Sequence, residues 1–219
     1  MNKKIGIAFD LDGTLVDNNK YHIESWQVFY KKRGWQLSNE TYNTYFNGKT
    51  NKDVLNFIYK KELSAEEITQ LTNEKESLYR EIYAPFIKPI AGLLPLLESL
   101  YQAEIPMVMA TSGIPDNIAF LFKHINIKKY FKDIINFTHI KKGKPDPEIY
   151  QLAVQKLGIP AQQCIAFEDA ISGIQSARSA GLKVIALTTT HQKEALKNVD
   201  LIIDNYTQIN IQQLYNICD

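Results

Sequence analysis

Short runs of apolar residues punctuate this chain, first near its N-terminus and then throughout its later part. They occupy residues 5–9, 107–110, 133–137, 164–167, 183–187 and 201–203. Between them, residues 114–125, 147–157 and 170–180 carry apolar side chains at helical spacing. Continuous apolar strands that alternate with helices are typical of a parallel sheet covered on both faces. We therefore predict an α/β fold with a Rossmann-like open parallel sheet, whose ligands collect at the carboxyl ends of the strands.

Residues 18–83 follow a different pattern. They contain no strand-like aliphatic run, and Trp26, Phe29 and Tyr30 share one face of a helix. Ser64 followed by Glu67 is a helix-start pattern with acidic residues in the first turn. The predicted division is an α/β catalytic core of residues 1–16 and 87–219, with an inserted all-helical domain of residues 17–86.

Composition narrows the class of protein. Hydrophobic residues make up 45% and charged residues 22% of 219, and the net charge is +1. Such balance predicts neither a nucleic acid nor a membrane as partner, and a monomer or weak dimer is expected. The basic run at residues 31–33 is interpreted as a solvated helix end. Cys164 lies in an apolar run and is expected to be a core residue, and no leader segment is recognised, so the expected location is cytoplasmic.

The first strand is followed directly by Asp10-Leu11-Asp12-Gly13-Thr14. Two carboxylates at one strand end repel each other unless a cation lies between them. A solvated turn is the plain alternative, since Asp and Gly are common in turns. A calcium-binding loop is excluded, because Leu15 and Tyr21 stand where that loop needs Gly and Glu.

Three further strand ends carry polar residues. Thr111, Ser112 and Gly113 follow one strand, Lys144 and Asp146 follow another, and Glu168 and Asp169 follow a third. Each has a structural alternative. Thr111 or Ser112 could cap the helix that follows them, and Glu168 or Asp169 could do the same for the helix after them. Lys144 could be a surface lysine, and Asp146 with Pro147 could start a helix. Because the carboxyl ends of parallel strands share one edge, we expect these residues to meet in one crevice.

This set of motifs resembles the haloacid dehalogenase-like hydrolase superfamily over essentially the whole chain, and the helical insertion resembles its α-helical cap. Within the superfamily the chain is most similar to the phosphatase branch that includes β-phosphoglucomutase. The resemblance implies phosphoryl transfer with Asp10 as nucleophile and Asp12 as the acid and base. Thr111 and Lys144 would assist, with Ser112 and Gly113 beside them to bind phosphate.

The resemblance also implies Mg²⁺ as the cofactor. Asp10, Asp169 and the backbone carbonyl of Asp12 would hold the ion, with Glu168 as a ligand or a close neighbour. A phosphate ester and an ionised Asp10 repel each other by roughly 8 kcal/mol at 4 Å, so fixed positive charge is needed for attack. Dehalogenating relatives usually lack an acid at the position of Asp12, and its presence favours phosphoryl transfer.

Residues of the helical insertion are also similar to the branch's substrate-binding positions. His22, Lys49, Thr50, Asn51 and Lys75 are the candidates. For His22 and Lys75 the alternatives are a surface or core histidine and a solvated helix lysine. Asn51 stands where mutases of the branch carry an Arg that holds a second phosphate. The expected activity is therefore hydrolysis of a small phosphorylated metabolite, such as a sugar phosphate, with a phosphohexomutase as the alternative.

Two hypotheses from other classes of protein are weighed against a phosphoryl-transfer enzyme. A non-catalytic protein that binds a phosphorylated ligand would have no need of the proton-transferring Asp12. A dinucleotide-binding oxidoreductase would need a G-x-G-x-x-G pattern after the first strand, which this sequence lacks.

Overall fold

The structure is a computed structural model that describes residues 4–46 and 49–219. It divides into two compact units, one of residues 1–17 and 88–219 and one of residues 18–87. The first unit is built on a parallel sheet of order β3-β2-β1-β4-β5-β6. Its strands are β1 (Gly6–Phe9), β2 (Met107–Ala110), β3 (Asp133–Ile135), β4 (Cys164–Glu168), β5 (Lys183–Leu187) and β6 (Leu201–Ile203). The predicted α/β fold with an open parallel sheet is confirmed.

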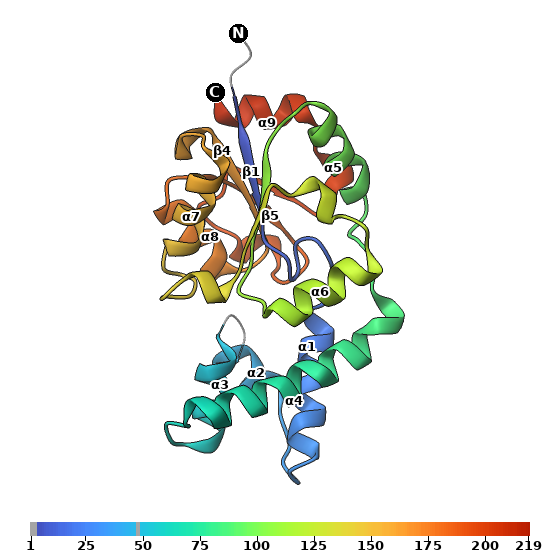
Figure 1. Ribbon diagram of the computed structural model, residues 1–219, viewed down its shortest axis with the longest axis vertical. Coiled ribbons are helices and arrows are strands. Elements are labelled where there is room, and N and C mark those ends of the chain that lie inside the picture. The colour runs from blue at the N-terminus through green and yellow to red at the C-terminus, as the bar shows by residue number, and fades with distance from the viewer. Residues whose placement is uncertain (1–3, 47–48) are drawn as a thin grey trace. The chain divides into compact units, whose positions relative to one another are not determined.

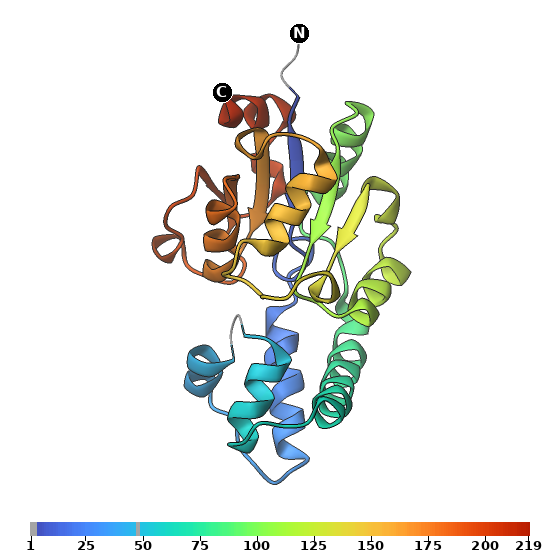
Figure 2. The same ribbon diagram turned by 60° about the vertical axis from the view of Figure 1, so that its left-hand side comes forward.

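Helices cover both faces of this sheet (Figure 1). On one face, α7 (Glu148–Leu157) contacts β1, β2 and β3, while α8 (Ile171–Ser179) contacts β4 and β5. Figure 2 shows α7 lying in front of the strands. On the other face, α9 (Ile211–Cys218) contacts β4 and packs against α5 (Leu93–Gln102). The remaining α-helix of the unit is α6 (Pro115–His124), which follows β2.

Strand β1 lies at the centre of the sheet, between β2 and β4. Its residues are fully buried because helices cover both sheet faces, which explains why the strand is apolar throughout. On the other face from α7, the Phe9 and Phe167 rings stack with centroids 4.8 Å apart. The connection from β1 to β2 returns through α5 on the α9 face, whereas β4 leads into α8 on the other face. Such a switch point between neighbouring strands is where open α/β sheets bind ligands.

Across its described residues, 18–46 and 49–87, the second unit has helices and no strand. They are α1 (Asn19–Lys31), α2 (Asn39–Tyr45), α3 (Asn51–Tyr59) and α4 (Ala65–Tyr83). Their shared core includes Trp26, Phe29, Tyr42 and Leu55. Helix α4 begins as expected, since the Ser64 side chain and Glu67 form a capping box.

Short 3-10 turns complete the described elements. They are η1 (Ala84–Phe86), η2 (Lys128–Tyr130), η3 (Phe137–His139), η4 (Ala161–Gln163), η5 (Lys193–Ala195) and η6 (Tyr206–Gln208). The apolar run at residues 133–137 was expected to be strand throughout. It ends as strand at Ile135, because the Asn136 side chain accepts a hydrogen bond from the Thr138 amide and starts a turn. Within the described ranges, the structure has no helix with the length and apolarity needed to span a bilayer.

Candidate active site

Asp10 follows β1 directly and starts a tight loop. Its amide donates to the Phe167 carbonyl of β4, so the loop begins in register with the sheet. Gly13 has φ of +75°, a conformation that glycine adopts without strain, and its amide donates to the Val16 carbonyl. The Asp10 side chain is buried, with the residue only 6% exposed. A buried carboxylate in a loop closed by its own backbone is not a solvated turn, so that alternative is wrong for Asp10.

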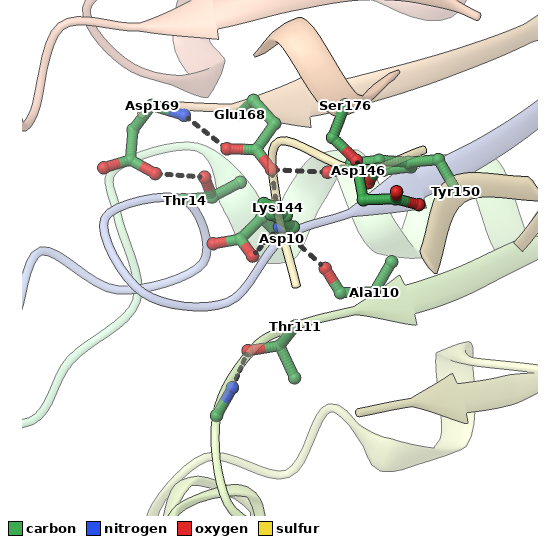
Figure 3. A network of polar contacts seen from close by, with 11 residues as sticks. Asp10, Thr14, Ala110, Thr111, Lys144, Asp146, Tyr150, Glu168, Asp169 and Ser176 are labelled. Atoms are coloured by element: carbon green, nitrogen blue, oxygen red, sulfur yellow. Dashed lines mark hydrogen bonds and ion pairs between the residues drawn. The ribbon is translucent and has the colours of Figure 1, made fainter. Parts of the chain in front are cut away.

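Lys144 reaches the same place from the loop before α7 (Figure 3). Its Nζ atom lies 2.6 Å from Asp10 Oδ1 and 2.6 Å from Glu168 Oε1. The same ammonium donates to the Ala110 carbonyl at the end of β2, at 3.2 Å. The side chain is 8% exposed, so Lys144 is not a surface lysine.

Glu168 is the last residue of β4 and is 1% exposed. Its Oε1 atom accepts from Lys144 and, at 2.6 Å, from the Tyr150 hydroxyl. Its Oε2 atom accepts from the Asp169 amide at 3.2 Å. The carboxylate is therefore held by three donors within the α/β unit.

Asp169 is buried beside it and also has defined partners. Thr14 Oγ1 donates to Asp169 Oδ1 at 3.2 Å, and Thr190 Oγ1 donates to Asp169 Oδ2. Helix α8 begins at Ile171 with no side-chain cap, so neither acid is a helix cap.

Oxygen atoms of Asp10, Glu168 and Asp169 all lie within 4.8 Å of one another. With every carboxyl ionised, the three groups carry a charge of −3 against +1 on Lys144. At that separation and an effective dielectric of about 20, each pair of carboxylates repels by at least roughly 3 kcal/mol. The pocket therefore fits a hard divalent cation, because it offers buried carboxylate oxygens and an excess of about two negative charges.

The ionisation of these groups reflects the same crowding. Burial raises the pKa of the Asp10 carboxyl group well above its ordinary value. The positive charge of Lys144 opposes this rise, whereas the neighbouring carboxylates add to it, namely those of Glu168, Asp169 and Asp12. Burial and the Glu168 charge raise the pKa of Asp169 to about 7, although Thr190, Lys144 and Thr14 oppose the shift. Burial alone would lower the pKa of Lys144, but Asp10 and Glu168 outweigh it and raise that pKa. A cation between the carboxylates would oppose both shifts, because its positive charge favours the ionised form of each carboxyl group.

Thr111 follows β2 and is 1% exposed. Its Oγ1 atom accepts from the Gly113 amide at 2.9 Å. A Cβ atom added to Gly113 would lie 3.1 Å from Thr111 Oγ1 and 3.8 Å from Asp12 Oδ2, which places Asp12 at this turn. Ser112 is exposed. The alternative that Thr111 or Ser112 caps the next helix is wrong, because α6 starts after Ile114 without a side-chain cap.

The alternative that Asp146 and Pro147 start a helix is nearly right, but the helix begins one residue later than that alternative places it. Helix α7 begins at Glu148 with Pro147 before it, and Asp146 Oδ1 accepts from the Glu148 amide. The Asp146 carbonyl accepts from Ser176 Oγ at 2.6 Å, which ties the loop that carries Lys144 to α8.

In the helical unit, Lys75 is the most informative candidate. It is 2% exposed, so the alternative of a solvated helix lysine is wrong. Its Nζ atom lies 2.9 Å from Glu76 Oε1 and 2.9 Å from His22 Nδ1. The His22 ring stacks on Tyr79, with centroids 3.9 Å apart.

The other candidates of this unit have different roles in its folding. Asn51 Nδ2 donates to Glu76 Oε1 at 2.8 Å and so joins the Lys75 cluster. Thr50 is the N-cap of α3, where its hydroxyl accepts from the Asp53 amide. Lys49 is exposed. Of the five candidates, the structure thus brings three together, because His22 contacts Lys75, and Lys75 and Asn51 both contact Glu76.

Sequence reasoning gave no individual role to four residues of the α/β site, of which Thr14 was noted only as part of the first motif. Tyr150 and Thr190 bind the two acids, Thr14 binds Asp169, and Gly173 lies against Glu168. Thr190 could have been predicted, because it follows β5 at the same edge of the sheet, where the polar residues after the other strands also gather. Tyr150 gave no such signal, because a buried aromatic on a helix is ordinarily a core residue.

Comparison with known proteins gives matches along nearly the whole chain. A family model described as haloacid dehalogenase-like hydrolase matches residues 7–187. Validoxylamine A 7'-phosphate phosphatase from Streptomyces hygroscopicus subsp. limoneus is 28% identical over 201 residues, which cover 92% of this chain and 93% of that protein. Hexitol phosphatase A from Escherichia coli strain K12 is 29% identical over 211 residues, which cover 96% and 95%.

A solved structure agrees in both fold and sequence. The crystal structure of a HAD hydrolase of family IA, variant 3, from Entamoeba histolytica HM-1:IMSS has a TM-score of 0.90 and 34% identity. The match covers 98% of this chain and 99% of that one. Because the family match runs from β1 through β5 and contains the loops that bring Asp10, Lys144 and Glu168 together, this chain belongs to the haloacid dehalogenase-like hydrolases.

Proposed function

We propose that this hydrolase is a magnesium-dependent phosphatase of small phosphorylated metabolites that works through an aspartyl-phosphate at Asp10. The observation that carries the proposal is the buried contact of Lys144 with both Asp10 and Glu168, at 2.6 Å each, beside Asp169. This arrangement supports the proposal because the Lys144 ammonium and two further buried carboxylates, which would suit a divalent cation, surround the Asp10 carboxylate beside the central strand. Such a carboxylate is suited to attack an anionic phosphorus centre.

Asp10 and Asp169 would hold the magnesium ion with their carboxylates, together with the backbone carbonyl of Asp12. Glu168 is their neighbour, and its oxygens already accept three hydrogen bonds. When bound, the ion supplies positive charge that offsets repulsion between the phosphate ester and the pocket.

In the first step, an Asp10 oxygen forms a bond to phosphorus as the bond to the ester oxygen breaks. Asp12 gives its proton to the leaving oxygen, so an alcohol departs and an aspartyl-phosphate remains. In the second step, Asp12 takes a proton from water, whose oxygen bonds to phosphorus while the Asp10–phosphorus bond breaks. Inorganic phosphate leaves, and Asp10 and Asp12 return to their starting states.

Lys144 and Thr111 act on the charge of the transferred group. The Lys144 ammonium adjoins the Asp10 oxygen, and it lowers the cost of bringing a phosphoryl group there. The Thr111 hydroxyl accepts from the Gly113 amide, and it retains a proton to donate to a phosphoryl oxygen. Ser112 and Gly113 complete the turn that would contact phosphate.

Two relatives whose names describe phosphatases of a phosphorylated small molecule and of hexitols support this substrate class. The phosphohexomutase is the alternative. Holding a bisphosphate calls for a fixed cation at each end, and Asn51 is neutral. Its amide donates to Glu76, which favours a monophosphate substrate and hydrolysis. We further propose that His22, Lys75 and Asn51, with the exposed Lys49 and Thr50, contribute to substrate selection.

The experiment is a screen of phosphorylated sugars, polyols and other metabolites, with released phosphate measured in magnesium and in EDTA. The expected result is magnesium-dependent release that is lost in Asp10→Asn and Asp12→Asn proteins of unchanged fold. Full activity in Asp10→Asn would overturn the nucleophile assignment. Interconversion of β-glucose 1-phosphate and glucose 6-phosphate without phosphate release would establish the mutase instead, and tight binding without turnover would establish a phospho-ligand binder.

A further inference from the structure

Tyr150 places one hydroxyl in an otherwise apolar cluster between the sheet and its helices. The residue is on α7, is 0% exposed and packs among aliphatic side chains of that cluster. A buried hydroxyl without a partner is costly. Here it donates to Glu168 Oε1 at 2.6 Å, which is a hydrogen bond to a carboxylate and so stronger than one between neutral groups.

The ring of Tyr150 also contacts Lys144. The Lys144 Nζ atom lies 5.1 Å from the ring centroid, within the range of a cation–π interaction. Tyr150 therefore touches both members of the Lys144–Glu168 pair, the carboxylate through its hydroxyl and the ammonium through its ring. Tyr150 and Lys144 both donate to the same Glu168 oxygen, Oε1, and all three residues are labelled in Figure 3.

Gly173 borders Glu168 from α8. A Cβ atom built on Gly173 would lie 2.1 Å from the Glu168 carboxyl carbon and 2.1 and 2.2 Å from its two oxygens. Any side chain at this position would collide with the carboxylate. The glycine thus leaves a space of the size that the carboxylate fills, in a helix where alanine is otherwise preferred.

We propose that Tyr150 and Gly173 are positioning residues that fix the Glu168 carboxylate, and that Glu168 in turn fixes the Lys144 ammonium against Asp10. The catalytic consequence of this inference rests on the proposed function, whereas the positioning itself does not. Asp10 and Lys144 come from separate loops, and their 2.6 Å contact depends on where Glu168 stands.

The first test measures thermal unfolding in a double-mutant cycle. Gly173→Ala is expected to lower the midpoint temperature of the natural protein, because its new methyl group collides with Glu168. In a Glu168→Ala background the colliding atoms are gone, and the same substitution is expected to raise the midpoint, as alanine favours a helix. Equal effects of Gly173→Ala in the two backgrounds would overturn the role of Gly173.

The second test removes only the hydroxyl, with Tyr150→Phe, and so does not depend on whether Glu168→Ala folds. Tyr130→Phe is the matched control, because the Tyr130 hydroxyl also donates to a carboxylate, that of Glu98 at 2.7 Å. With a substrate from the screen, kcat is expected to fall about tenfold in Tyr150→Phe while KM stays within about twofold. The control is expected to keep both values, and an unchanged kcat in Tyr150→Phe would refute the positioning role.

A spectroscopic readout separates this inference from the proposed function. In protein labelled with ¹⁵N-lysine, the Lys144 ammonium signal, assigned through Lys144→Met, is expected to shift and broaden in Tyr150→Phe and to stay unchanged in Tyr130→Phe. An unshifted signal contradicts the inference even if the enzyme is active. An inactive natural protein whose Lys144 signal responds as expected contradicts the proposed function alone.

Discussion

Replacing Lys144 by Met removes the positive charge of the pocket and keeps a side chain of similar length. The Lys144 ammonium lies 2.6 Å from one oxygen of Asp10 and 2.6 Å from one of Glu168. At an effective dielectric of about 20, each contact amounts to roughly 6 kcal/mol of Coulomb attraction. Part of this is offset because the variant no longer buries an ammonium group. The expected net loss of unfolding free energy is about 3–5 kcal/mol, as for other buried pairs that lose one partner.

The assay is urea unfolding at neutral pH, with Lys156→Met as the matched control. Lys156 also pairs with an aspartate, Asp133 at 2.8 Å, but its side chain is 48% exposed. The control should lose less than about 1 kcal/mol. Magnesium should stabilise Lys144→Met more than the natural protein, because the variant leaves more negative charge uncompensated. Equal losses in Lys144→Met and Lys156→Met would refute the reasoning that the pocket depends on this lysine.

Two further predictions concern other polar contacts. Thr190→Val removes the hydroxyl that donates to Asp169, and the magnesium affinity, measured by calorimetry, should fall about tenfold while the fold is retained. An unchanged affinity would mean that this hydrogen bond does not orient Asp169 toward the ion. Arg33→Met breaks the paired hydrogen bonds to Glu74 at 3.1 and 2.7 Å, and should cost about 1 kcal/mol of unfolding free energy at pH 7. Arg33 lowers the pKa of Glu74, so this contribution is present above the ordinary Glu value of about 4.3 and is lost as the pH falls through the lowered value. Arg33 also donates to Phe29 and Tyr59, and those contacts do not need the Glu74 charge, so a difference between the two proteins that fails to shrink in acid would contradict the pairing.

The fold could be predicted because its signals are local. Each strand of the sheet is a short apolar run, since both faces of a parallel sheet are buried, and a run such as residues 164–167 can be recognised without knowing its neighbours. The meeting of Asp10, Lys144 and Glu168 followed from one rule, that the ends of parallel strands share an edge. The end of β3 could not be foreseen, because it depends on the hydrogen bond between Asn136 and Thr138.

Residues whose role depends on a distant partner were harder to predict. The basic run at residues 31–33 was expected to be solvated, and Lys31 and Lys32 are exposed. Arg33 is an exception, because Glu74 of another helix binds its guanidinium. Tyr150 and Lys75 are similar cases. A helical pattern shows which face of the helix is buried, but it does not show which polar atom will contact a side chain on that face.

The central claim is that Asp10 carries the phosphoryl group during turnover. The most direct measurement is rapid quenching of a single turnover, reduction of the acyl phosphate with borohydride, and mass spectrometry of the peptide that contains Asp10. We predict that Asp10 is converted to homoserine only when both substrate and magnesium are present. Turnover that leaves Asp10 unmodified, or a phosphoryl group trapped on another residue, would contradict the account.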